Sequence, residues 1–435
     1  MSVPEQAAGS EADRPHSKRL GVSDNYCDYP FSSIHVATDG SVSPCCEYAG
    51  SVGNVKSASL ATLWSGPGMA AIRESFKADE RPEACWKCFQ LEESEGASLR
   101  TKRLRAIETS ADANRFSVCS APRMVDIRFS NLCNLRCRTC GPQNSSKWYK
   151  DALALGYSLG EKAEIKSFPT LGNLIEQFSE WVDHIEYIYF AGGEPLLIED
   201  HYIILELLIK RGRTSVNLIY TTNMTVLACH GRSIIDLWSH FPNVLMEASV
   251  DGVGARGGLI RKDFVWDKFV SHVSEIRQKC PHVAIVFGVT VSIFNILTLT
   301  ELLEVLRRDC GATAASFFLH SLQEPSHYRT QVLLEAQKIQ AAQSIEYYLA
   351  KTGFEAFGNE QAWPALAEHL RGIKDYMNIE DRSLELKNFR ETSGKLDVIR
   401  AEDTQSILPE LAAIWEEKPS WLTRFRSRFQ RATKS

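Results

Sequence analysis

Three cysteines lie within one run of eight residues, Cys-Asn-Leu-Arg-Cys-Arg-Thr-Cys, at Cys133, Cys137 and Cys140. A closed zinc site or an ordinary iron–sulfur cluster takes four protein ligands, so three thiolates leave one coordination position open. An open position is where a metal site does chemistry, because a substrate or cofactor atom can occupy it. The spacing allows two alternatives. One is a four-iron cluster with one free iron, and the other is a zinc ion that takes its fourth ligand from elsewhere.

A second set of cysteines comes earlier in the chain. Alternating residues on both sides of Asp39-Gly40 predict a β-hairpin, which brings the cysteines at its two ends together. A C-x2-C pair then follows a helical run. Four thiolates complete a tetrahedral site, so we expect this site to be closed, with zinc and an iron–sulfur cluster as alternatives. Cys46 could replace its neighbour as a ligand. The four cysteines are Cys27, Cys45, Cys85 and Cys88.

Composition limits the class of protein. The chain has 435 residues, 44% of them apolar and 24% charged, which is ordinary for two or three globular domains. A formal charge of -5 argues against nucleic acid as the main partner. No apolar run approaches the ~18 residues of a membrane span, and the polar start lacks the apolar core of a signal peptide. We therefore expect a cytoplasmic protein, in which close cysteines serve metal or redox sites.

Short apolar strands alternate with amphipathic helical stretches between residues 125 and 322. Six such repeats predict a parallel sheet with right-handed crossovers. We favour a partial (β/α)6 barrel of the TIM type over a doubly wound sheet, because polar residues recur where the strands end. Thr298 and Glu301 predict a capping box, and Gly311 predicts a helix C-cap. The expected strands are 125–130, 185–190, 216–221, 244–250, 284–292 and 315–320, and the expected helices are 171–182, 201–211, 233–241, 264–279 and 300–309.

The rest of the chain suggests three further units. A long helical pattern covers 330–351, and the basic stretch 418–435 is expected to form a terminal helix, either resting on the protein or docking on a membrane surface or partner. The expected division is a disordered tail over 1–22, a cysteine-rich module over 23–110, the barrel over 120–330 and a helical extension over 331–435.

Polar residues mark the ends of several predicted strands. Ala191-Gly-Gly-Glu-Pro195 follows the second strand, where two glycines let a backbone approach a ligand and a carboxylate can accept from an ammonium group. Alternation along the fourth strand places Glu247, Ser249 and Asp251 on one face. A polar face on a buried parallel strand is costly unless it lines a site, so we expect these residues to line one.

The C-x3-C-x2-C run after the first strand and Gly-Gly-Glu after the second resemble the radical S-adenosylmethionine (SAM) superfamily. In that family three cysteines hold a [4Fe-4S] cluster whose fourth iron is chelated by exchangeable SAM. Reductive cleavage of SAM gives a 5′-deoxyadenosyl radical that abstracts hydrogen from the substrate. Thr139 departs from the family, which often has an aromatic residue there. The resemblance implies Gly192, Gly193 and Glu194 for the SAM amino group, Ser249 and Asp251 for the ribose, Arg261 for the carboxylate, and Thr222, Asn223 and Asn295 at the rim.

The pattern C-x12-G-x4-C around Gly40 resembles the SPASM and twitch modules, which hold auxiliary [4Fe-4S] clusters in that superfamily. Only one later C-x2-C pair is present, so the shortened twitch form with a single auxiliary cluster fits better. Such modules usually follow the barrel. Here the module precedes it, which resembles a subset of these proteins.

The resemblance implies an enzyme that oxidises or epimerises a sugar or other small molecule, helped by the auxiliary cluster and an external electron donor such as flavodoxin or ferredoxin. The alternative is the same chemistry on a peptide or protein side chain; the absence of a recognisable leader-peptide-binding domain favours the small molecule. A zinc-stabilised scaffold without catalysis is the third possibility. The candidate substrate residues are Arg128, Glu247 and His320, with Cys229 as a thiol that returns hydrogen in an epimerisation.

Overall fold

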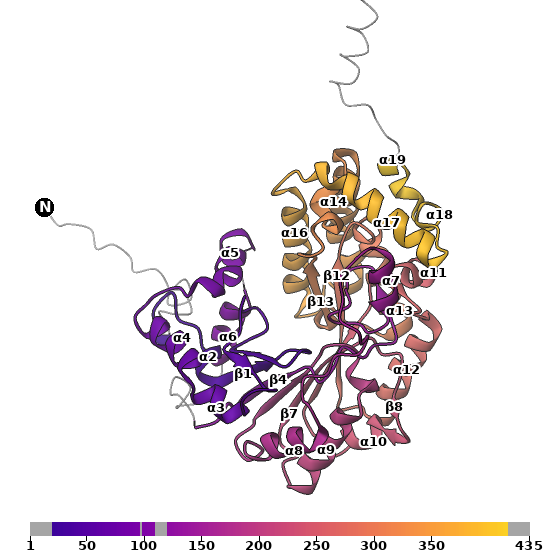
Figure 1. Cartoon of the computed structure of the whole chain (residues 1–435). Coiled ribbons are helices and arrows are strands. Elements are labelled where there is room, and N and C mark those ends of the chain that lie inside the picture. Colours follow the sequence, from indigo (N-terminus) through magenta and orange to yellow (C-terminus); the bar gives the residue numbers. More distant parts are fainter. Residues whose placement is uncertain (1–19, 96–97, 109–119, 416–435) are drawn as a thin grey trace, which may run out of the picture.

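The computed structural model describes residues 20–95, 98–108 and 120–415, so most of the predicted tail and the whole basic stretch 418–435 lie outside the described residues. Nine strands form one sheet in the order β13-β12-β10-β7-β6-β4-β1-β2-β3 (Figure 1). From β4 to β13 the strands follow one another in chain order and pair in parallel. They are β4 Met124–Ile127, β6 Tyr187–Phe190, β7 Asn217–Thr222, β10 Val244–Ser249, β12 Ala284–Val291 and β13 Phe317–Ser321.

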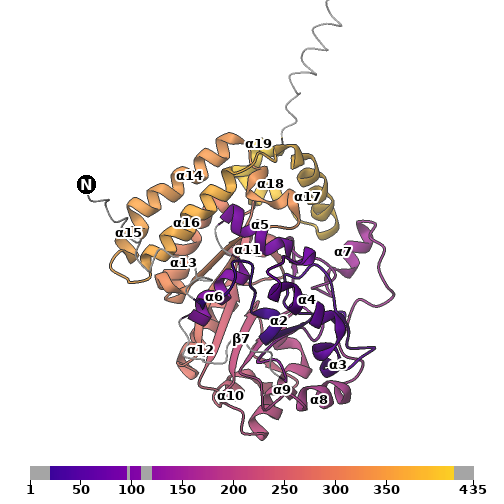
Figure 2. The ribbon, with the colours of Figure 1, turned by 90° about the vertical axis from the view of Figure 1, so that its left-hand side faces the viewer.

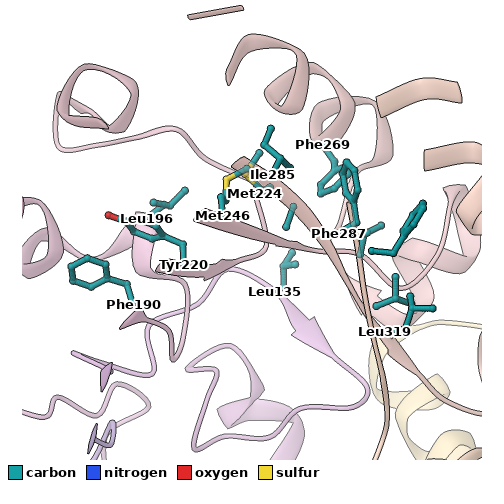
Figure 3. Close-up of a cluster of buried hydrophobic side chains, with 14 of the residues drawn as sticks. Leu135, Phe190, Leu196, Tyr220, Met224, Met246, Phe269, Ile285, Phe287 and Leu319 are labelled. Carbon is teal, nitrogen blue, oxygen red and sulfur yellow. The ribbon is translucent and has the colours of Figure 1, made fainter. Parts of the chain in front are cut away.

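This sequential strand order confirms the predicted partial (β/α)6 barrel. A doubly wound sheet reverses its order at a switch point, and here the order does not reverse. Alternate residues are buried along β6 and β7, where one set faces the covering helices and the other faces the hollow of the sheet. Figure 3 shows part of the core on the helix side, including Phe190, Tyr220 and Met246. The covering helices are α8 Leu171–Ser179, α9 Glu199–Lys210, α10 Ile234–Trp238, α12 Trp266–Lys279 and α13 Leu299–Cys310.

Two local predictions about helix ends meet different outcomes. Gly311 adopts the left-handed conformation with φ 60°, which confirms the predicted C-cap of α13. The capping box at Thr298 is wrong, because a 3-10 turn, Ile296–Thr298, leads directly into α13 and the threonine side chain makes no capping bond. The long helix predicted over 330–351 is shorter. A 3-10 turn, Thr330–Val332, and extended backbone at Leu333 and Leu334 come before α14 (Glu335–Ala350) begins.

The N-terminal module continues the barrel sheet. Its strands β1 (Ser33–Val36) and β2 (Ser41–Ser43) form the predicted hairpin, with His35 opposite Ser43. On its other side β1 pairs in parallel with β4, so that the module extends the sheet edge (Figure 1). The sequence predicted a compact unit but not this pairing. The remaining elements are β3 Gly53–Asn54, α2 Tyr29–Ser32, α3 Leu60–Ser65, α4 Pro67–Lys77, α5 Trp86–Glu95 and α6 Leu99–Glu108.

The C-terminal extension is helical and packs at the opposite end of the sheet from the module (Figures 1 and 2). Helix α16 contacts β13, and α17 contacts α7, the helix that follows the cysteine run of the barrel. No helix in the described ranges has the length and apolarity that crossing a membrane requires. Helix α7 spans Trp148–Ala154. The helices of the extension after α14 are α15 Thr352–Phe357, α16 Trp363–Asn378, α17 Leu386–Arg400, α18 Thr404–Ile407 and α19 Ala412–Trp415.

Candidate active site

The three cysteines after β4 line one hollow of about 250 Å³, which we call the cluster pocket. Their loop is held by the two-residue strand β5 (Arg136–Cys137), which pairs with β11 (Arg261–Lys262). Burial, together with the charge of Cys137, raises the pKa of Cys133, and the same two causes raise the pKa of Cys140 to about 12. Buried thiols that disfavour one another's ionisation fit a site in which bound iron removes their protons.

Two side chains reach the sulfur atoms of this loop. Asn223 Nδ2 donates to Cys133 Sγ at 3.7 Å, and Arg261 Nη1 donates to Cys137 Sγ at 3.9 Å. Hydrogen bonds to ligating sulfur orient the ligands and tune the potential of an iron–sulfur cluster. Both residues were assigned to SAM by resemblance. In the structure they contact the sulfur atoms of two of the three cysteines.

The Gly-Gly-Glu turn packs against the start of the cysteine run. Gly192 has φ +75°, and a Cβ there would lie 2.6 Å from Cβ of Arg128. Gly193 has φ +54°, and its Cβ would strike the carbonyl oxygen of Leu132. Both the backbone conformation and the close approach therefore require glycine.

Glu194 is fully buried beside that turn. Its Oε1 accepts from Leu196 N at 3.0 Å and Thr222 Oγ1 at 2.6 Å, and its Oε2 accepts from Asn223 N at 2.6 Å. Burial raises the pKa of Glu194, and these hydrogen bonds oppose that shift. A carboxylate has about four acceptor positions, so three bonds leave one for a further donor.

Several of the residues assigned by resemblance meet around the cluster pocket, and three lie behind its wall. Asp251 Oδ2 pairs with Arg261 Nε at 2.8 Å, and Asp251 Oδ1 accepts from Thr290 N. Asn295 uses its amide on the main chain of Asp251, Thr290 and Ser292. Glu194, Asp251 and Asn295 are absent from the described lining, whereas the lining includes Gly192, Gly193, Thr222, Asn223, Ser249 and Arg261, together with Thr139.

A larger hollow of about 580 Å³, which we call the central cavity, lies on the inner face of the sheet. It shares Arg128, Tyr189 and Thr221 with the cluster pocket. At its other end it shares Cys45 with a third hollow, the module pocket, which the four module cysteines line. The central cavity therefore joins the two cysteine sites.

The polar side chains on the barrel side of the central cavity are paired with one another. Asp126 lies 3.0 Å from Nδ1 of His35 and 3.6 Å from Nε of Arg128. His35 comes from the module strand β1, in register with Asp126. The sequence analysis did not single out Asp126 or His35. Asp126 has the same inward-facing parity as Arg128, whereas His35 reaches this cavity wall only because β1 pairs with β4.

A second chain of hydrogen bonds holds Glu247. Its Oε2 accepts from Thr221 Oγ1 at 3.2 Å, and Thr221 is 2.8 Å from the hydroxyl of Tyr189. Burial raises the pKa of Glu247, an effect that the bond from Thr221 opposes. The absence of a side chain at Gly288 leaves the room that the Glu247 carboxylate occupies. His320 also lines the cavity, with Nε2 3.0 Å from Thr290 Oγ1.

Cys229 is the predicted residue that the structure separates from the others. The chain after β7 forms a small hairpin, β8 (Ala228–Cys229) and β9 (Arg232–Ser233), and the thiol donates to the carbonyl of Leu197 at 3.3 Å. In the described part of the chain it lines neither the cluster pocket nor the central cavity. The prediction placed it on the mouth side from chain order alone, and the structure places it in this hairpin against the main chain of Leu197.

The four module cysteines face one another in the module pocket. Burial and then neighbouring thiols raise the pKa of Cys85 to about 11, and the pKa of Cys27 is raised well above its ordinary value for the same reasons. Cys46 does not line this pocket in the described residues; its thiol lines the central cavity beside Asp126 and Arg128. No three His, Cys, Asp or Glu side chains among the described residues converge tightly enough for a single metal ion.

The chain matches two protein families. The model of SPASM, an iron–sulfur cluster-binding domain, matches residues 27–89, and the model of the radical SAM superfamily matches residues 127–308. Together the two matches span more than half of the chain. No curated protein matches it.

Among solved structures, the native anSMEcpe with bound AdoMet is 14% identical, with a TM-score of 0.37, over 54% of this chain and 62% of that one. Streptococcus suis SuiB bound to S-adenosylmethionine is 12% identical, with a TM-score of 0.37, over 67% and 62%. SuiB bound to the precursor peptide SuiA is 12% identical, with a TM-score of 0.37, over 68% of this chain and 62% of that one. The chain thus spans less than two thirds of the length of these proteins.

Each matched segment contains one cysteine set. Residues 27–89 contain the module cysteines, and residues 127–308 contain the loop Cys133–Cys140, which we call the cluster loop. The iron–sulfur description of the first match favours a cluster over zinc in the module, and the second match favours the radical SAM alternative over a zinc-stabilised scaffold. The chain belongs to the radical SAM superfamily, its SPASM domain precedes the barrel, and the two domains imply [4Fe-4S] clusters and SAM as cofactors.

Proposed function

We propose that this enzyme oxidises a substrate held in the central cavity by radical chemistry. The observation that carries the proposal is the shared wall of the three hollows. The central cavity meets the cluster pocket at Arg128, Tyr189 and Thr221, and it meets the module pocket at Cys45. A substrate there is within reach of both cysteine sites.

When bound, SAM and the barrel cluster supply a 5′-deoxyadenosyl radical that abstracts hydrogen, and the module cluster supplies a one-electron acceptor. Cys133, Cys137 and Cys140 are proposed to hold the first cluster, and Cys27, Cys45, Cys85 and Cys88 the second. In this proposal Asn223 and Arg261 orient the barrel thiolates, and an external donor such as flavodoxin or ferredoxin provides the electron.

Oxidation also requires a group that accepts a proton from the substrate. Glu247 is our candidate, because its carboxylate lines the central cavity and is held by Thr221. Burial raises its pKa, which brings a carboxylate closer to the range in which general bases work at neutral pH. Arg128 is fixed between Asp126 and the glycine turn, so we assign it to orienting the substrate.

We propose a peptide or protein side chain as the substrate, in place of the sugar expected from the sequence. Leu99, Met124, Ile219 and Phe318 give the cavity an apolar wall. The polar groups on the barrel side are largely paired with one another, as described above. A sugar needs a hydrogen bond for each buried hydroxyl, whereas a side chain buries mostly apolar surface.

Anaerobic reconstitution tests the proposal in two steps. Two four-iron clusters predict about eight irons per chain, with 5′-deoxyadenosine formed from SAM and dithionite. The protein is then given a pool of peptides or a pool of nucleotide sugars. Oxidation of a peptide appears in mass spectra as the loss of two hydrogen atoms. Turnover of a nucleotide sugar alone would overturn the peptide assignment, and zinc in place of iron would overturn the chemistry.

One observation favours a second outcome, epimerisation. Cys46 lines the central cavity, unlike Cys229. A substrate carbon radical would take the hydrogen atom of the Cys46 thiol, forming a C–H bond and leaving a sulfur radical. One electron from a flavodoxin or ferredoxin and one proton from water would then restore the thiol.

Solvent deuterium distinguishes the two outcomes for whichever pool reacts. Epimerisation in D₂O places one deuterium in the product, and Cys46→Ala removes it while SAM cleavage continues. Oxidation leaves the product without solvent deuterium at carbon, and Cys46→Ala then changes the product little.

A further inference from the structure

A buried arginine of the cluster loop is held by the C-terminal extension. Arg138 lies between the second and third cysteines of the loop and is 1% exposed. Its Nη2 pairs with Asp397 and lies 2.6 Å from Oε2 of Glu402. These carboxylates come 259 and 264 positions later in the chain, from α17 and the turn that follows it. Glu402 also pairs with Lys262 of β11 at 3.1 Å, next to Arg261.

A second contact reaches the loop through helix α7. Arg400, at the end of α17, donates from Nε to Asp151 Oδ2 at 2.8 Å, and both side chains are buried. The other oxygen of Asp151 accepts from Arg136 of the loop at 3.3 Å. The guanidinium of Arg400 lies 4.7 Å from the ring centre of Trp148, whose Nε1 donates to the carbonyl of Cys137 at 2.7 Å.

An apolar contact accompanies these ion pairs. Leu396 of α17 is fully buried and packs with Trp148 and Ala152 of α7, with Cys140 at the edge of this cluster. The same face of α17 therefore makes polar and apolar contact with the loop and with the helix that follows it.

Stability alone does not explain a network of this kind. Removing ions from water is costly, and a buried ion pair is often no more stabilising than apolar side chains of the same size. Here Nε and Nη1 of Arg138, and both Nη atoms of Arg400, have no hydrogen-bond partner among the described residues. In some proteins such pairs are retained for the geometry that they impose.

We propose that α17 and the turn after it position the cluster loop, with Arg138, Asp397, Glu402, Arg400 and Asp151 as positioning residues for the three cysteines. All of these contacts join protein groups to one another, and in the proposed role they hold the loop in place before the cluster assembles. This role of α17 does not depend on which substrate the protein takes or on the outcome of the radical reaction. It gives the C-terminal extension a role in the barrel site.

Cysteine-resolved alkylation of the full-length apo protein tests the proposal. The variant is Asp397→Asn with Glu402→Gln, which removes both charges and keeps the side-chain size. The control is Glu391→Gln with Lys395→Gln, which removes an exposed ion pair from the same helix. Iodoacetamide labelling followed by mass spectrometry should show Cys133, Cys137 and Cys140 reacting about tenfold faster in the variant, which corresponds to a loss of about 1.4 kcal/mol from the free energy of opening the loop. The module cysteines should react at the wild-type rate in both proteins.

The module cysteines separate local from global effects. Equal acceleration of both cysteine sets would mean general unfolding, and unchanged labelling of the loop would mean that α17 merely covers it; either result overturns the proposal. If the double variant does not fold, Arg138→Lys takes its place, because lysine keeps the charge but cannot fork between two carboxylates. In reconstituted protein the EPR spectrum of the reduced barrel cluster with SAM should change in the variant and stay at wild type in the control.

Discussion

The two cysteine sites of this protein are built in opposite ways. The barrel set comes from a single loop of eight residues. The module set is spread over several elements: Cys27 precedes α2, Cys45 follows β2, Cys85 ends a 3-10 turn and Cys88 lies in α5. Donors to the barrel sulfurs include the side chains of Asn223 and Arg261. Donors to the module sulfurs come from within the module: the main chain of Tyr29 to Cys27, the main chain of Glu47 to Cys45, and the side chain of Ser98 to Cys88.

This difference follows from what each site must do. A closed site needs only that the chain fold around it, so donors from within the module suffice. An open site must hold its ligands with one position free, and here the side chains of Asn223 and Arg261 reach the barrel sulfurs from other segments of the chain. We therefore expect substitutions around the barrel site to affect chemistry more than substitutions around the module.

The largest expected contrast is between the cysteines themselves. Cys137→Ala should reduce 5′-deoxyadenosine formation to background, a loss greater than the roughly 100-fold seen when only a supporting side chain is removed. Cys88→Ala should retain measurable SAM cleavage but lose substrate oxidation, since it disturbs the module pocket alone. The measurement is anaerobic SAM cleavage with dithionite, with iron counted per chain. Loss of cleavage in Cys88→Ala would contradict the separation of the two sites.

Next in size is the effect of the side chains that support the barrel thiolates. Asn223→Ala removes the donor to Cys133 Sγ, and we expect cleavage to fall by about 10- to 100-fold. Arg261→Lys keeps the charge beside Asp251 but loses the planar fork, so its loss should be smaller than that of Arg261→Gln. Thermal melts of the apo proteins separate lost stability from lost cleavage. Equal losses in the lysine and glutamine variants would show that the charge by itself contributes nothing and that the planar fork is what matters.

Matched glycine substitutions compare the two regions directly. Gly193→Ala forces a side chain onto Leu132 at φ +54°, and Gly40→Ala places one 2.6 Å from the carbonyl of Ser167 at φ +87°. Both should cost more than the ~1–2 kcal/mol of a left-handed alanine alone. Gly231→Ala, with φ +80° and open space, is the control for the backbone cost. Only Gly193→Ala should impair SAM cleavage in protein that has folded, as judged by circular dichroism.

The smallest expected effect concerns the pH dependence of stability. Burial raises the pKa of Glu247, so the folded state favours the protonated carboxyl and loses stability as pH rises above the ordinary carboxyl range near 4.3. Glu247→Gln should therefore melt at a higher temperature than wild type at pH 8, with the difference vanishing near pH 4. Substrate oxidation should fall in the same variant. A wild-type melting temperature at pH 8 would mean that the carboxylate is well solvated in the cavity.

Local patterns allowed much of the barrel to be predicted. The predicted strands are recognisable because apolar residues alternate or run continuously over four to eight positions. Gly311 marks the end of α13 by its local conformation alone. Errors occurred where a neighbouring element decided the outcome. Thr298 belongs to a 3-10 turn that leads into α13, so the predicted capping box does not form. The role predicted for Cys229 stays a prediction, and its thiol lies in a hairpin that chain order did not reveal.

Contacts between residues far apart in the chain could not be predicted from the sequence. The alignment of His35 with Asp126 depends on β1 joining the barrel sheet at its edge. Asp251 and Arg261 were assigned separately to ribose and carboxylate, yet they form a buried pair with each other. Arg138, between two cysteines, reads as a surface residue until α17 covers it.

The sequence by itself determined the chemistry of this protein, because three cysteines in eight residues and a Gly-Gly-Glu turn act through short stretches of chain whose geometry is local. The tertiary structure decided how that chemistry is contained. It joined the module to the barrel sheet and brought α17 into contact with the cluster loop. It also placed Cys46, rather than Cys229, in the described lining of the central cavity. Those contacts depend on which faces pack together, and packing is a property of the whole fold rather than of any one segment.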